Sequence, residues 1–428
     1  MSGMTSNLHR RILLLRQRVK VLATLRGTVK LPPDHDLSEP QWQALLRPLE
    51  SLASRLGDRL ERAVARYLPR TAATQQARKL SYLLGEIELE ASRAFDLYDT
   101  YVDVLTQRHS PELGPRLRGC DALARDGLGR DHPALRLIEP PVVYCERGFG
   151  AAVLRSGVML AGGVPNVAPL IQIPYERLKD GGLLQLTAIA HECGHEALTL
   201  TGLASTIAAA IVDGLERSGA PAEVASFFAH WASELGPDFW AFGCCGPGQA
   251  ATLREFVALP PDSAFRMSML VRHPPPFIRT LCSFDWCRQV WGGGPWDGWE
   301  DEWRTLYPLD YAPQSTRSLL AACQMAIPDV SRILLRTKFK VLGDRRIADL
   351  FDLGTLAPAA LARTAERLLR GGDRSSRPMT ELAAFRHLQH EATIDDADLN
   401  RRVAAWLCGL TVPRSSLNVI ALPKMKVG

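Results

Sequence analysis

The residues best suited to chemistry lie in the segment LTAIAHECGHEALTL, residues 186–200, where a glutamate directly follows the first of two histidines. His191 and His195 are four residues apart, so a helix would place both on one face. Two such imidazoles can reach one zinc ion at about 2.0–2.1 Å. Glu192 would lie beside that ion, within reach of a water bound to it. The H-E-x-x-H spacing thus predicts a zinc site for hydrolysis; two histidines on a half-buried helix face are the alternative.

A catalytic zinc ion needs a third protein ligand and an open fourth position. Glu234 and Asp238 follow in the segment HWASELGPDFW, spaced E-x-x-x-D. Glu234 could supply the third ligand, and Asp238 could orient a ligand histidine through its free ring nitrogen. His230, four residues before Glu234, is the rival ligand. Because Pro237 follows Gly236 and proline disrupts a helix interior, we expect Glu234 at a helix end or a kink.

The segment HPPPFIR offers two further polar groups, His273 and Arg279. A histidine and an arginine near a hydrolytic site can stabilise the oxyanion that develops on the attacked carbonyl. Three prolines with fixed φ angles would hold such donors in place. The alternative is that Arg279 pairs with an acidic residue such as Asp285 and that His273 caps a helix.

The motifs HECGH, ELGPD and HPPPFIR, in this order, resemble those of the gluzincin zinc metallopeptidases, closest to the CAAX-prenyl-protease-like branch and its soluble bacterial relatives. The resemblance covers roughly residues 140–290, and PLIQIPYERL (169–178) resembles that family's strand-then-helix approach to the zinc helix. A strand there could hold an extended peptide by edge pairing. Two departures are that the family's membrane helices have no counterpart here and that Gly-Pro separates the two carboxylates. The resemblance implies zinc ligands His191, His195 and Glu234, the base Glu192, Asp238 behind a ligand, and transition-state assistance from His273 and Arg279.

The rest of the chain predicts a mainly helical protein of α+β class. Residues 1–134 form an N-terminal helical region, with Ser38 and Gln41 in capping-box spacing. Residues 135–290 hold three short β-rich segments and the motifs, which the resemblance makes a zincin-like metallopeptidase core with a small antiparallel or mixed sheet. Residues 291–428 form a C-terminal helical region, with helices expected over 329–342, 355–371 and 396–410.

Two long amphipathic helices of the N-terminal region, 37–68 and 80–107, predict a helical hairpin. Amphipathic stripes are usually core, so structural support is the favoured interpretation. A partner protein binding through these helices is the alternative.

Composition restricts the function classes. A net charge of +5 over 428 residues, with no dense basic run among interleaved aromatics, argues against a nucleic-acid partner. No run of about 18 apolar residues exists, so we expect no membrane span. Nine cysteines without a C-x-x-C pair indicate the reduced cytoplasm. Within the motif, Cys193 should point into packed core, and Glu196 is either a group behind the ligands or a surface charge.

These observations predict a cytoplasmic zinc metalloendopeptidase that hydrolyses a protein or peptide substrate through zinc-bound water, with Glu192 as general base. The alternative is an interaction or regulatory protein on a peptidase scaffold with a structural zinc. Glu192 argues against that alternative, because a purely structural site has no use for a base at this position.

Overall fold

The computed structural model describes residues 3–136, 138–148, 150–160, 163–179, 181–372, 377–391 and 394–410. Contacts divide these residues into two compact units. Unit 1 takes residues 3–114 and Gly157–Ala168, and unit 2 takes Pro115–Ser156 and Pro169–Leu410. The boundaries of these two units differ from those of the three regions expected from the sequence, 1–134, 135–290 and 291–428. The assignment of functions to those three regions stays a prediction. The chain is mainly helical with a small mixed sheet, as expected.

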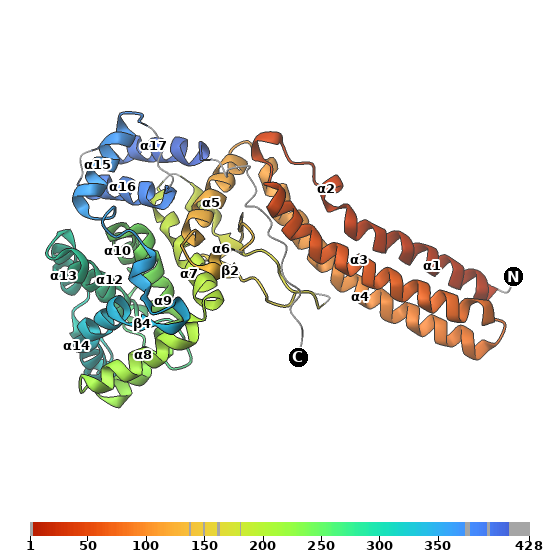
Figure 1. Ribbon diagram of the computed structural model, residues 1–428, viewed down its shortest axis with the longest axis horizontal. Coiled ribbons are helices and arrows are strands. Elements are labelled where there is room, and N and C mark those ends of the chain that lie inside the picture. Colours follow the sequence, from red (N-terminus) through yellow and green to blue (C-terminus); the bar gives the residue numbers. More distant parts are fainter. Residues whose placement is uncertain are drawn as a thin grey trace. The chain divides into compact units, whose positions relative to one another are not determined.

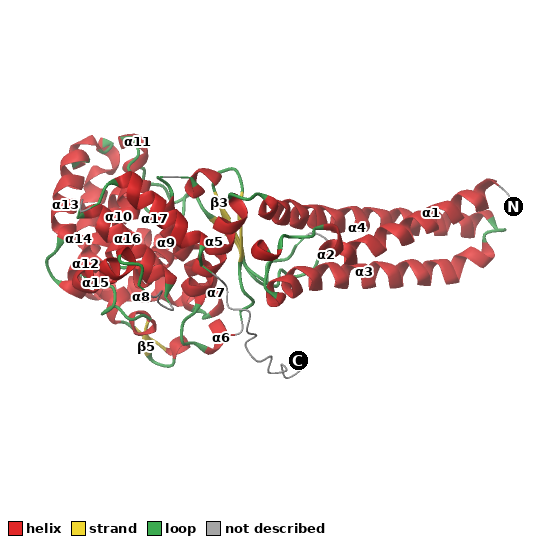
Figure 2. Cartoon of the chain, turned by 90° about the horizontal axis from the view of Figure 1, so that it is seen from above, coloured by secondary structure: helices red, strands yellow, loops and turns green. Residues whose placement is uncertain are grey.

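Unit 1 is built on three long helices that run side by side (Figures 1 and 2). They are α1 (Gly3–Val21), α3 (Glu39–Tyr67) and α4 (Thr74–Thr106). The predicted hairpin is α3 and α4, and α1 packs against both of its helices. The shorter elements are α2 (Leu25–Thr28) and 3-10 turns at Leu22–Thr24, Pro33–His35, Leu68–Arg70 and Gln107–His109.

The start of α3 follows from its sequence. The backbone N–H of Ser38 donates to the Gln41 side chain (3.0 Å), so the predicted capping box is present. Leu49, Leu56 and Leu60 then recur at helical spacing and are buried. The apolar stripe of α3 therefore faces the other helices of unit 1, which confirms the helical interpretation of this region.

The sheet of unit 2 has three strands in the order β1–β3–β2. They are β1 (Val142–Cys145), β2 (Ala152–Leu154) and β3 (Leu170–Ile173). β3 pairs with β1 in parallel, and with β2 in antiparallel register at Val153 and Ile171. The expectation that the strand in 169–178 offers an edge to a peptide is wrong for β3, because both of its sides are already paired. β2 forms an edge of the sheet and packs on α7.

Two helices at the centre of unit 2 carry the motif residues: α7 (Ala188–Leu200) and α9 (Ala222–Cys245), which α8 (Leu203–Arg217) connects. All three pack against one another. The expected helix end at Glu234 is wrong, because α9 continues through Pro237. The expected kink stays a prediction. Proline removes one hydrogen-bond donor and crowds the preceding turn. The packing of this buried helix against its neighbours outweighs that local cost, so Glu234 lies mid-helix.

The remaining helices of unit 2 surround this centre (Figure 1). The helix expected over 329–342 ends at Arg336. A short strand follows, because Lys338 and Phe339 pair with Arg346 and Arg345 across a tight turn at Gly343, whose φ angle is 66°. The elements are α5 (Leu113–Leu128), α6 (Pro133–Arg136), α10 (Pro247–Phe256), α11 (Pro261–Ala264), α12 (Pro276–Trp291), α13 (Pro295–Leu306), α14 (Gln314–Arg336), α15 (Pro358–Leu369), α16 (Pro378–His390), α17 (Asp396–Cys408), β4 (Lys338–Phe339), β5 (Arg345–Arg346), and 3-10 turns at Tyr175–Leu178, Leu183–Thr187, Leu309–Tyr311, Lys340–Leu342 and Ile347–Leu350.

Among the described residues, α14 is long and apolar enough to cross a membrane by length and composition. The pair Leu183–Leu200 and Leu203–Arg217 passes the same test together but bends by 90°. A core helix of a soluble protein also passes it, and α14 packs on α8, α9 and α12. The feature is therefore weak evidence for a span.

Candidate metal centre

The centre depends on a close crossing of α7 and α9. A Cβ atom placed on Gly194 would lie 2.7 Å from Cα of Pro237, so only glycine fits this position without a shift. Next to it, a Cβ on Gly236 would lie 3.3 Å from the Leu198 side chain. The absence of side-chain bulk on both helices lets α9 approach until Glu234 reaches the histidines of α7. Gly194 therefore leaves room for close packing of the two helices.

Three donor atoms converge at this crossing. Oε2 of Glu234 lies 3.5 Å from Nε2 of His191 and 3.6 Å from Nε2 of His195, and the three ligand atoms lie within 4.8 Å of one another. Two atoms bound to one ion at about 2.0–2.2 Å and a tetrahedral angle are about 3.3–3.6 Å apart. These separations are therefore long for hydrogen bonds but right for ligands of one metal ion.

The Glu234 oxygen also indicates a cation. Oε2 is buried and has no hydrogen-bond partner among the residues that the structure describes. A buried carboxylate oxygen without a partner is costly, and a metal ion would relieve that cost. The group His191, His195 and Glu234 could therefore bind a metal ion, as the sequence predicted.

Asp238 lies behind His191, one turn after Glu234 on α9. Nδ1 of His191 donates to Oδ1 of Asp238 (2.8 Å), which leaves Nε2 facing Glu234. Arg279 of α12 donates to both Asp238 oxygens, with Nη2 2.7 Å from Oδ1. Because Asp238 is fully buried, this pair of partners fixes both the ring orientation and the tautomer of His191.

The charges of the cluster shift its pKa values. Burial lowers the pKa of His191, but the charge and hydrogen bond of Asp238 outweigh burial and raise this pKa to about 9. Burial raises the pKa of Glu234, but the adjacent His191 and His195 imidazoles outweigh burial and bring this pKa well below its usual range. For Asp238, burial is again opposed, chiefly by the charge of Arg279, and the pKa is lowered. Both carboxylates are therefore held ionised, as a cation site requires.

Glu192 differs from Glu234 and Asp238 in that its pKa is raised. It is buried on α7, and burial is the largest cause of the shift, opposed by the charges of His191 and His195. Desolvation of this kind moves a carboxyl group toward the pKa of an effective general base. Its position directly after a metal-ligand candidate and its raised pKa both fit the role predicted from the motif.

The HPPPFIR segment reaches the centre at two different places. Nε2 of His273 lies 3.2 Å from Oε2 of Glu234, and the His273 side chain is 59% exposed. Arg279 instead lies behind His191, with Nη2 3.4 Å from Nδ1 of that ring. His273 is thus on the solvent side of the cluster and Arg279 on its buried side. This placement favours His273 over Arg279 for direct contact with a substrate.

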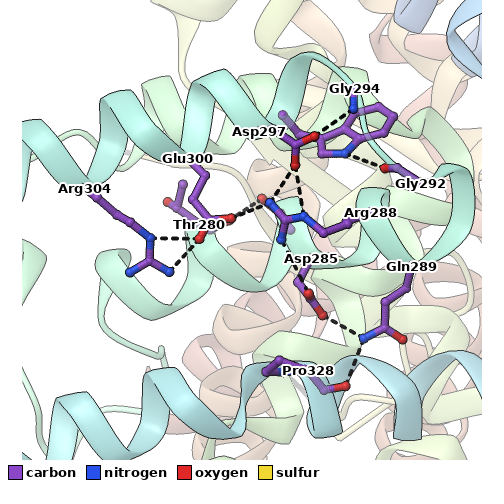
Figure 3. Close-up of polar contacts among 12 residues, drawn as sticks. Thr280, Asp285, Arg288, Gln289, Gly292, Gly294, Asp297, Glu300, Arg304 and Pro328 are labelled. Carbon is purple, nitrogen blue, oxygen red and sulfur yellow. Dashed lines mark hydrogen bonds and ion pairs between the residues drawn. The ribbon is translucent and has the colours of Figure 1, made fainter.

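The alternative partner for Arg279, Asp285, is engaged elsewhere. Asp285 accepts a hydrogen bond from Gln289 (2.8 Å) and lies 3.6 Å from Arg288, as Figure 3 shows. Arg288 also donates to Asp297, which ties α13 to α12. Asp285 is therefore the wrong partner, but the alternative that Arg279 pairs with an acidic residue is confirmed, because it pairs with Asp238.

Two polar residues near the centre acquire roles that the sequence left open. The rival ligand His230 bonds through Nε2 to the carbonyl oxygen of Val271 (3.0 Å) and lies outside the three-residue group. Glu196 is buried and accepts hydrogen bonds from the backbone N–H and the hydroxyl of Ser156, just after β2, so it is no surface charge. Cys193 is buried, as expected, and donates to the carbonyl of Ala124.

The arrangement as a whole is a buried cluster of two imidazoles and one carboxylate that could hold a metal ion, with a second carboxylate of raised pKa beside it. No protein-family model, curated protein or solved structure matches the chain.

Proposed function

We propose that the protein is a zinc-dependent metallopeptidase with a zincin-like core, which hydrolyses peptide bonds of a protein or peptide substrate. The observation that supports this most is the convergence of His191, His195 and Glu234 from two helices, with Glu192 buried beside them. Zinc is the metal of choice because two imidazoles and one carboxylate are a common ligand set of catalytic zinc. When bound, the ion supplies Lewis acidity at an open fourth position.

The chain's own residues divide the remaining work. Glu192 takes a proton from the attacking water and returns it to the leaving amine, for which its raised pKa is suited. His273, on the solvent side of Glu234, donates to the oxygen of the attacked carbonyl as negative charge develops there. Asp238 and Arg279 hold the His191 ring from behind.

A polypeptide substrate also needs a surface that binds extended backbone. β2 is an edge strand, and an edge can pair with an added strand through main-chain hydrogen bonds. Arg155 and Ser156, directly after β2, bond to Thr199 and Glu196 of α7, which carries the ligand histidines. A peptide that pairs with β2 would therefore be held next to α7, the helix that carries the ligand histidines.

The second candidate function is that of an interaction or regulatory protein with a structural zinc. Its partner proteins would bind to the helices of unit 1. Structural zinc sites are closed by four protein ligands. The group found among the described residues supplies three, which favours the catalytic interpretation. We place the enzyme in the cytoplasm, because none of its nine cysteines, all of which the structure describes, forms a disulfide.

Elemental analysis of purified variants tests the proposal. We expect about one zinc per chain in the wild type and its loss in His191→Ala, His195→Ala and Glu234→Ala, because each removes one ligand. His230→Ala is the matched control on the same helix and should keep its zinc, since His230 bonds to a backbone carbonyl. Full zinc in either α7 variant would overturn the site. Loss of zinc in His230→Ala but not in Glu234→Ala would assign the third ligand to His230.

A further inference from the structure

One face of α9 contacts the segment 271–279 at three successive points. His230, Glu234 and Asp238 are spaced by four residues, so they lie in a row along the helix. Their partners follow in the same order: the carbonyl of Val271 for the first, His273 for the second and Arg279 for the third. The segment therefore runs along α9 in a defined register.

The distance between the first two contacts is similar on α9 and on the segment 271–279. His230 and Glu234 are one helical turn apart, about 6 Å along the axis. Val271 and His273 are two residues apart, and two residues of chain span at most about 7 Å. Because the two lengths nearly match, the bond at Val271 determines which residue of the segment can reach Glu234.

We propose that His230 is a positioning residue, whose Nε2–H holds the Val271 carbonyl and so keeps the His273 imidazole beside Glu234. The His273 side chain is largely exposed, so side-chain packing restrains it little, and its position depends on the backbone that carries it. Pro274 and Pro275 fix the backbone after His273, and the His230 bond fixes it before. This inference rests on the proposed function, because it gives His273 its catalytic role.

Hydrogen exchange in the zinc-loaded, full-length protein tests the anchor without any substrate. His230→Leu keeps side-chain bulk but removes the donor, and His230→Gln is the matched control, because its terminal amide can still donate at a similar distance. We expect the hydrogen-bonded amides of Leu270 and Val271 to exchange about fivefold faster in His230→Leu, because the turn that holds them loses the anchoring bond at the Val271 carbonyl. Exchange should return toward the wild-type rate in His230→Gln, and zinc content should be unchanged in both.

Equal exchange in wild type and His230→Leu would overturn the proposal, as would loss of zinc in His230→Leu or failure of His230→Gln to restore protection. If circular dichroism shows that His230→Leu is misfolded, His230→Asn, whose amide is one bond shorter than that of glutamine, replaces it with the same expectations. These results do not depend on peptidase activity. They stay decisive if the wild type cleaves no peptide, an outcome that would count against the proposed function alone.

A double-mutant cycle with a quenched fluorescent peptide library tests the route of the effect. We expect His230→Leu to lower kcat about tenfold with little change in KM, and to have no further effect in a His273→Ala background. A residue that merely supports the fold would lower activity to the same degree in both backgrounds. That additive result would contradict action through His273.

Discussion

Asp238 is a fully buried carboxylate that serves two partners, His191 and Arg279. An ion pair at this depth is sensitive to the loss of either member, because the remaining charge is left without compensation. The same carboxylate fixes the ring of a candidate metal ligand. Metal affinity and fold stability are therefore coupled through this one side chain.

Asp238→Asn should separate these two contributions. We expect its free energy of unfolding to fall by about 3–5 kcal/mol, because Arg279 becomes a buried charge without a counter-charge. Zinc affinity should fall about 10–100-fold, because His191 loses its charged orienting partner. Urea unfolding of the metal-free protein and competition with a chelator measure the two effects.

The double variant Asp238→Asn with Arg279→Met is the control. It removes the unpaired charge, so it should recover part of the lost stability while zinc affinity stays low. An Asp238→Asn protein that binds zinc as tightly as the wild type would contradict the role of Asp238 behind His191.

The sequence was sufficient to predict which residues form the centre, but not which hydrogen-bond partners hold the residues around it. His191 and His195 follow from helix geometry alone, because four residues bring side chains to one face. The role of His230 could not be predicted, since its partner is a backbone carbonyl 41 residues away and carries no side-chain signal. For Arg279, the sequence suggested an acidic partner such as Asp285, and the packing of α12 on α9 makes Asp238 that partner instead.

Among the helices, the site depends on how closely α7 and α9 approach each other where they cross. Gly194 faces Pro237 across the crossing, at a point where both helices present little side-chain bulk. The sequence predicted a helix end or a kink at Glu234, because proline is unfavourable within an isolated helix. In the folded chain, α9 is packed on α7, α8 and α14, and these contacts keep it continuous.

Gly194→Ala tests this approach. The added Cβ would lie 2.7 Å from Cα of Pro237, a backbone atom that cannot turn aside, so the helices must move apart. We expect a loss of about 1–3 kcal/mol in the free energy of unfolding and weaker zinc binding, because Glu234 moves away from the histidines. Thermal unfolding and chelator competition measure both.

Gly298→Ala is the matched control. Gly298 lies within α13, and a Cβ there meets nothing within 4 Å. This variant should be stabilised by about 0.5–1 kcal/mol, as expected for glycine to alanine in a helix, with unchanged zinc affinity. Equal effects of the two substitutions would show that the crossing of α7 and α9 tolerates a side chain.

At the scale of the whole molecule, the candidate metal centre belongs to one of the two compact units. His191, His195 and Glu234 all lie in unit 2, whereas unit 1 is a set of packed long helices. The sequence predicted the helices of unit 1 from their apolar stripes and caps. It did not predict the division of the chain, because the units are set by contacts between residues far apart in the sequence.

Metal removal should act on the two units differently. A ligand that binds only the folded form stabilises the part of the chain that holds it. We therefore expect calorimetry of the full chain to show two transitions, of which chelation lowers only the one assigned to unit 2. The His191→Ala variant provides the assignment, because its unit 2 transition should not respond to zinc. Equal shifts of both transitions would contradict a metal centre confined to unit 2.

If Glu192 performs hydrolysis at the proposed metal centre, the protein must create new peptide termini in its substrates, and these termini can be identified. Zinc-loaded wild type and Glu192→Gln are incubated with a proteome, and the new termini are compared by mass spectrometry. Glutamine keeps the shape of the side chain but cannot accept the proton, so zinc should stay bound while cleavage falls by a factor of about 100 or more. We expect termini that the wild type forms and that Glu192→Gln does not. Identical sets of termini in the two samples would contradict it.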